Sequence, residues 1–173
     1  NYIAGLLAEL PTASGLREIS LMYSQIGTRG ISALLTSRNL AALRSLAIWH
    51  SALFPDDIAP IGEHGERLEE LALTGNDLSL ESINLLCSSK ALSRVRFLRL
   101  ESNPIGGGGG LAIASSAAFP NLAVLVVGDQ TPESVAQIAT SRSLSKLRTF
   151  LADGPTLGVP LARALAAAVP THP

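Results

Sequence analysis

The chain has 173 residues, of which 47% are hydrophobic and only 4% aromatic, and its formal net charge is −1 at pH 7. This length and composition allow one sizeable hydrophobic core and exclude a disordered chain. A charge so close to zero excludes a bulk attraction to nucleic acid or to an anionic membrane, and a single cysteine excludes a disulfide framework and a cysteine-based zinc site.

The residues that open the chain and the lengths of its apolar segments indicate where in the cell the protein is expected. The longest unbroken apolar runs, residues 122–127 and 164–169, are too short to span a bilayer. No basic and apolar signal peptide opens the chain. Together with the single cysteine, these features favour a cytoplasmic location. The first residue is Asn1 rather than methionine, which predicts a processed protein or a piece of a longer one.

An internal repeat organises nearly the whole chain. Six apolar residues recur at intervals of 25 or 27 positions, and further apolar residues follow three, five and usually ten positions after each. These starting residues are Leu16, Leu43, Leu68, Val95, Leu122 and Leu147. The predicted units are residues 16–42, 43–67, 68–94, 95–121, 122–146 and 147–173 of a single domain. Residues 1–15 align with the helical half of a preceding unit.

The unit resembles the leucine-rich repeat, L-x-x-L-x-L-x-x-N-x-L, strongly in the first four units and more weakly in the last two. Residues 26–30 and 105–109 are similar to the I-G-x-x-G turn of the ribonuclease-inhibitor-like subclass. The resemblance implies an α/β solenoid, a right-handed βα superhelix in the shape of a horseshoe segment. Its parallel sheet is expected on the concave face and its helices on the convex face. The start in mid-repeat fits truncation of a larger protein or an N-terminal cap made of one helix.

The repeat has a physical reason, because alternate side chains of a strand face opposite sides of a sheet. One side chain from each unit is expected to stack in file inside the solenoid, and stacking makes one continuous core. The residues of this file are Leu21, Ile48, Leu73, Leu100 and Val127. Polar side chains eight positions into a unit are expected to bind backbone groups where the strand ends. Asn76 and Asn103 fit this role best, and Ser24, Ser51 and Gln130 fit it less completely.

Charged residues segregate within the unit. Many acids follow a strand or open a helix, whereas ten of the 13 cations lie near a helix end or a strand start. These cations are Arg17, Arg38, Arg44, Arg67, Lys90, Arg94, Arg96, Arg142, Lys146 and Arg148. We interpret the pattern as compensation of parallel helix dipoles, worth about 0.3–1 kcal/mol for each charge. The alternative is a basic edge for an acidic partner or nucleic acid.

No motif predicts catalysis, a metal or a cofactor. Residues 106–110 form a glycine run, but no Walker lysine follows it, and the run is expected to be a mobile structural turn. His50, His64 and His172 are scattered, and no nucleophile elbow accompanies them, so we predict no catalytic triad. His64 is expected in a solvated loop. Cys87 falls at an apolar helix position and is expected to fill the core.

The outward strand positions form two groups on the open face of the sheet. The first, the aromatic cluster, lies beside small residues (Ser20, Ala47 and Ala72) and consists of Met22, Tyr23, Trp49 and His50. The second, the apolar patch, consists of Phe97, Val124, Val126 and Leu151. A one-residue slip in the weak fifth unit would exchange Val124 and Val126 with Leu125 and Val127. Four charged residues lie among these groups: Glu18, Glu70, Arg99 and Glu101.

These features predict a non-enzymatic protein-interaction module whose concave sheet face binds another protein. Trp49 and Tyr23 are the expected anchors, because Trp and Tyr are enriched at binding hot spots. The four charged residues of the face would set polar specificity. One alternative is the substrate-recognition part of a larger effector, ubiquitin-ligase-like or immune-receptor-like protein. A second is binding of a small ligand or glycan at the Trp49 and Tyr23 floor. The apolar patch also fits self-association or cover from within the full protein.

Overall fold

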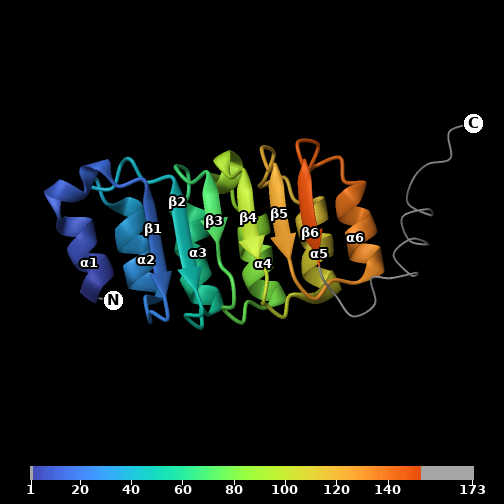
Figure 1. Ribbon diagram of the computed structural model, residues 1–173, viewed down its shortest axis with the longest axis horizontal. Coiled ribbons are helices and arrows are strands. Elements are labelled where there is room, and N and C mark those ends of the chain that lie inside the picture. Colours follow the sequence, from blue (N-terminus) through green and yellow to red (C-terminus); the bar gives the residue numbers. More distant parts are fainter. Residues whose placement is uncertain (1, 153–173) are drawn as a thin grey trace, which may run out of the picture.

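The computed structural model describes residues 2–152. Within this range six parallel strands form one sheet in chain order, and six α-helices lie in a layer behind it (Figure 1). The strands are β1 (Glu18–Met22), β2 (Ser45–Trp49), β3 (Glu70–Ala72), β4 (Phe97–Leu100), β5 (Val124–Val127) and β6 (Thr149–Ala152). The α-helices are α1 (Tyr2–Glu9), α2 (Gly27–Thr36), α3 (Pro55–His64), α4 (Leu80–Cys87), α5 (Gly106–Ser115) and α6 (Pro132–Ala139). Two 3₁₀ turns, η1 (Pro11–Gly15) and η2 (Ala91–Arg94), precede β1 and β4.

The α/β architecture and the parallel sheet agree with the expectation for a leucine-rich repeat solenoid. Most of the predicted last unit, with His172, lies outside the described residues. None of the helices in residues 2–152 combines the length and the apolar character needed to cross a membrane.

The strand register confirms the predicted interior file. Leu21 lies opposite Ile48, and Leu100 lies opposite Val127. Ile48, Leu73, Leu100 and Val127 are buried, and Leu21 packs against the same core from a partly buried position. The slipped register of the fifth unit is excluded, because Leu125 is buried beside Val127 in the core.

The edge at which the strands begin is held together by the backbone. The carbonyl oxygen of Arg17 accepts hydrogen bonds from the N–H groups of Arg44 (2.8 Å) and Ser45 (2.9 Å) in the next unit. The same paired bond recurs along the sheet, for example from Ala123 and Val124 to the Arg96 oxygen at 2.8 and 2.9 Å. We call this row of accepting or donating residues the strand-start edge; it contains Arg17, Arg44, Glu69, Arg96, Ala123 and Arg148.

The opposite edge, where the strands end, is held by buried amide side chains as predicted. Asn103 Oδ1 accepts from the N–H groups of Asn76 (2.8 Å) and Leu78 (3.1 Å). Asn103 Nδ2 donates to the oxygens of Leu73 (2.8 Å) and Leu100 (2.9 Å). Asn76 Oδ1 in turn accepts from the Ser51 N–H at 2.8 Å. Each polar side chain therefore ties its own unit to the preceding one.

The same edge continues with weaker or shorter-range contacts. Ser51 Oγ accepts from the Ser24 N–H at 3.1 Å. Gln130 Nε2 donates to the oxygens of Gly128 (2.8 Å) and Gly106 (3.1 Å). Both contacts match the expectation that serine and glutamine fill the asparagine position less completely.

The glycine run differs from its prediction, because α5 begins at Gly106 and residues 106–110 form its first turns rather than a separate turn. The reason lies in α6 and the segment before it. A Cβ added at Gly107 would lie 2.8 Å from Thr131 Cγ2, and one at Gly110 would overlap Gln130 Oε1 and lie 2.8 Å from Ser134 Cβ. Glycine thus lets α5 approach this segment closely, which outweighs its poor helix propensity.

Candidate interaction surface

One face of the sheet is open. The helices lie on the other face, and no element of the described chain crosses in front of the strands (Figure 1). The side chains predicted to face outward include several large exposed apolar groups. Their exposed fractions are 76% for Tyr23, 55% for Leu151, 50% for Met22 and 40% for Phe97.

The structure brings the aromatic cluster together at the ends of β1 and β2. Met22 lies opposite Trp49 in register, and the Tyr23 N–H donates to the Trp49 oxygen at 3.0 Å. The Tyr23 and His50 rings stack, with centroids 5.4 Å apart and an interplanar angle of 18°. Backbone conformation positions them, because Tyr23 (φ 51°) and His50 (φ 49°) both adopt the left-handed region directly after their strands.

The next unit leaves room for this stack. Gly75 occupies the position equivalent to Tyr23 and His50, and it is also left-handed, with φ 65°. A Cβ at Gly75 would overlap the His50 imidazole. Glycine at this position therefore lets the His50 ring lie against the backbone of the third unit, and the exposed Tyr23 ring covers its other side.

Two polar atoms of residues predicted to face outward have no hydrogen-bond partner within the described chain. Trp49 Nε1 and Glu101 Oε2 are both shielded from solvent, and neither makes a hydrogen bond to any residue described. The other carboxylate oxygen of Glu101 lies 3.9 Å from Arg99 Nη1. A shielded donor without an acceptor costs about 1–3 kcal/mol.

The apolar patch follows on β4, β5 and β6. Phe97 lies opposite Val124, and Val126 lies opposite Leu151. The two valines are half-buried by their neighbours, whereas Phe97 and Leu151 are exposed. These residues present a continuous apolar surface across three strands.

The remaining predicted positions are spread along the sheet. Glu18 lies opposite Ser45, and the Ser45 hydroxyl donates weakly to Glu70 Oε2 at 3.4 Å. Glu18 and Leu151 lie on the first and last strands, so no single small ligand contacts all of the predicted residues. Ala47, expected on an open floor, is buried, because the neighbouring side chains cover its small methyl group.

The predicted dipole compensation is present at two positions. Arg67 donates to the oxygens of Leu35, Ser37 and Leu40, at the C-terminal end of α2. Asp57, in the first turn of α3, accepts from the Phe54 N–H at 3.0 Å. These contacts match the preference of helix C-termini for cations and of N-termini for anions.

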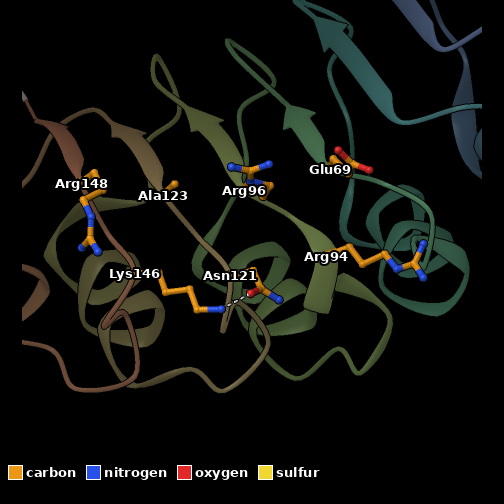
Figure 2. A pocket seen from close by; sticks show the side chains of 7 residues that line it. All are labelled: Glu69, Arg94, Arg96, Asn121, Ala123, Lys146 and Arg148. Atoms are coloured by element: carbon orange, nitrogen blue, oxygen red, sulfur yellow. Dashed lines mark hydrogen bonds between the residues drawn. The ribbon is translucent and has the colours of Figure 1, made fainter.

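The structure also contains a hollow that the sequence did not indicate. It lies at the strand-start edge below β4, β5 and β6 and has a volume of about 580 Å³ (Figure 2). Its lining residues are Glu69, Arg94, Arg96, Asn121, Ala123, Lys146 and Arg148. The only sequence signal was the gathering of cations at strand starts, which also fitted helix-dipole compensation.

The groups with catalytic potential lie apart from one another. Burial raises the pKa of the Cys87 thiol to about 11, and the side chain packs against the core as expected. His64 ends α3 rather than lying in a loop, and its Nε2 is 3.8 Å from Glu63 Oε2. Within residues 2–152, no three side chains of His, Cys, Asp or Glu are grouped so that they could hold a metal ion.

Comparison with known proteins adds one finding. Residues 95–114 match a family model described as Leucine Rich repeat. The matched segment contains β4 and all but the last residue of α5. No curated protein matches the chain. Leucine-rich repeat domains are generally non-catalytic and typically bind other proteins, so the match suggests a protein-interaction module. Together with the six-stranded parallel sheet, it supports a leucine-rich repeat protein.

Proposed function

We propose that this protein is a non-enzymatic interaction module that binds a partner protein on the open face of its sheet, the face expected to be concave. The single observation that carries the proposal is that, within residues 2–152, this parallel sheet is covered on one face only. Repeat solenoids use such an open face as an extended binding surface. The exposed aromatic and apolar side chains of this face supply apolar area that a partner would cover.

The aromatic cluster is the proposed anchor. Tyr23 is largely exposed yet conformationally restrained, because its ring stacks on His50 and its N–H is bound to β2. Trp49 lies opposite Met22 on the adjacent strand, beside the Tyr23 backbone that donates to its oxygen. Trp and Tyr are enriched among the few residues that dominate interfaces.

The charged residues would set specificity around these anchors. The proposed specificity residues are Glu18, Glu70, Arg99 and Glu101. Charged pairs at an interface contribute more to partner choice than to raw affinity. We also assign the chain to the ribonuclease-inhibitor-like subclass with the unit boundaries predicted above. The support is that α2 and α5 both begin at the first glycine of the I-G-x-x-G segment.

The test is affinity capture followed by a binding measurement on the purified partner. Tyr23→Ala is the cleanest variant, because its exposed side chain adds little to the core. Truncation of a true anchor is expected to cost at least about 2 kcal/mol, or roughly 30-fold in affinity. Phe54→Ala is the matched control, since Phe54 is an equally exposed aromatic residue (70%) at the start of α3. Equal affinity of wild type and Tyr23→Ala would contradict the anchor assignment.

Self-association is a second candidate, favoured by the exposed apolar patch. Sedimentation velocity over a range of concentrations would detect it as a rising mass. Val126→Asp and Leu151→Asp should abolish that rise, while Tyr23→Ala should leave it unchanged. A monomer at all concentrations would eliminate this candidate without affecting the first.

A further inference from the structure

The hollow at the strand-start edge is the strongest feature outside the open face of the sheet. Four of its lining residues are cations, and Figure 2 shows their side chains around it: Arg94, Arg96, Lys146 and Arg148. Its volume of about 580 Å³ falls in the range of ligand sites, about 300–1,000 Å³. Glu69 at one end is its only acidic lining residue, and that carboxylate lies 3.8 Å from Arg44 Nε, outside the hollow.

Within residues 2–152, these cations do not donate to carbonyl oxygens at a helix end as Arg67 does. Arg67 reaches three carbonyl oxygens near the end of α2, whereas the side chains of Arg94 and Arg96 make no hydrogen bond or ion pair within residues 2–152. Lys146 Nζ donates to the neutral Asn121 Oδ1 at 2.6 Å, and Arg148 makes one weak bond of 3.4 Å to the Leu147 oxygen. None of these four cations forms an ion pair with a carboxylate that the structure describes.

The small side chain of Ala123 leaves room for the hollow. Ala123 stands on the strand-start edge between Arg96 and Arg148, where a methyl group replaces the long side chains of its neighbours (Figure 2). Neighbouring strands are about 4.8 Å apart, so Arg96 and Arg148 are separated by about 10 Å along the edge. A peptide in the polyproline II conformation advances about 3.1 Å for each residue and has three residues per turn, so side chains three residues apart lie on the same side at about this separation.

We propose that this hollow binds an acidic peptide segment of a protein in the polyproline II conformation, with carboxylates spaced three residues apart. The cationic groups point in different directions rather than toward one centre (Figure 2), which suits a chain of separated anions better than one small ion. Single-stranded nucleic acid is less suitable, because such sites usually stack bases on aromatic rings and the lining residues include none. This site goes beyond the proposed sheet-face function and does not depend on it.

The experiment measures fluorescence anisotropy of a rhodamine-labelled peptide, acetyl-EAAEAAE-amide, with the full chain at about 150 mM salt. The Arg96→Gln, Arg148→Gln double variant should weaken binding about tenfold, because hydrogen bonds to charged groups are among the stronger ones. The matched control is Arg29→Gln, Arg38→Gln, which removes the same charge from two exposed cations outside the hollow. It should change the affinity less than about twofold.

A second pair of variants tests the space itself. Both Ala123→Gln and Ala123→Glu fill the space that the alanine leaves and should weaken peptide binding. Ala123→Glu also places a carboxylate between the two arginines and should weaken it further. Tyr23→Ala should bind the peptide as wild type does, which separates this site from the sheet face. Circular dichroism melting confirms that each variant is folded.

Several results would overturn the proposal. One is the absence of wild-type binding at about 1 mM protein. Another is an equal loss of affinity in the hollow variant and the charge-matched control, which would show bulk attraction only. Tighter binding of a short oligothymidine than of the peptide would assign the hollow to nucleic acid instead.

Discussion

The strand-end edge makes a quantitative prediction about Asn103. Its Oδ1 is the acceptor for two backbone N–H groups, those of Asn76 and Leu78, and all three residues are buried. Replacement by alanine removes the acceptor without leaving space that bulk water fills freely. Each orphaned buried N–H costs about 1–3 kcal/mol, so Asn103→Ala should lower the free energy of unfolding by about 2–6 kcal/mol. That is a large part of the total for a domain, about 5–15 kcal/mol.

The equivalent residue of the preceding unit provides an internal comparison. Asn76 Oδ1 accepts one N–H, that of Ser51, rather than two. Asn76→Ala should therefore cost about 1–3 kcal/mol, less than Asn103→Ala. Asn84→Ala is the control, because Asn84 is exposed on α4, and it should change stability by no more than about 0.5 kcal/mol.

The assay is equilibrium unfolding in urea, with hydrogen exchange as a local probe. A fall in the urea midpoint at a constant m value reports a loss of stability of the whole domain. The Asn76 and Leu78 amides should exchange faster in Asn103→Ala than in Asn84→Ala. A cost below about 1 kcal/mol for Asn103→Ala, or a smaller cost than for Asn76→Ala, would refute the view that the number of orphaned N–H groups sets the penalty.

Two further predictions concern α5 and the single cysteine. Gly110→Ala should destabilise the fold by about 1–3 kcal/mol in urea unfolding, because the added Cβ would overlap Gln130 Oε1. Gly108→Ala should stabilise it by up to about 1 kcal/mol, because the added Cβ there makes only ordinary van der Waals contacts with Leu80. Equal effects of the two substitutions would contradict the close-approach explanation. Cys87 should react slowly with a disulfide reagent at neutral pH and rapidly after denaturation, since burial raises its pKa to about 11. Because the native thiol keeps its proton to a higher pH, its contribution to stability is complete below pH 9 and is lost as the pH rises toward 11.

The repeat in the sequence was sufficient to predict the sheet and its register. Period-two alternation assigned Leu73 and Leu100 to the interior and Phe97 to the open face, as found. The spacing of 25 or 27 residues aligned each strand with the next, and therefore also placed Met22 beside Trp49. The pattern within one unit was enough to predict the sheet, because the strand of every unit has one face toward the core and one toward the open side.

Features that depend on contacts between units were beyond the sequence pattern. Gly110 of α5 is explained by the position of Gln130 in the next unit, whereas helix propensity alone disfavours glycine there. The alternation of strand side chains placed Trp49 on the open face, but alternation does not determine the side-chain rotamer that shields its Nε1. The hollow arises from one alanine between two arginines in the weakest part of the repeat pattern.

The two edges of the sheet differ in how strongly the fold constrains them. At the strand ends the backbone lacks partners, so side chains such as Asn103 must supply them and cannot change without cost. At the strand starts the backbone satisfies itself, since the Glu69 oxygen accepts both the Arg96 and Phe97 N–H groups, at 2.7 and 3.1 Å. The side chains of the strand-start edge are therefore not needed to satisfy these backbone groups. Their positive charge, gathered around Ala123, is better explained by a binding role than by the stability of the solenoid.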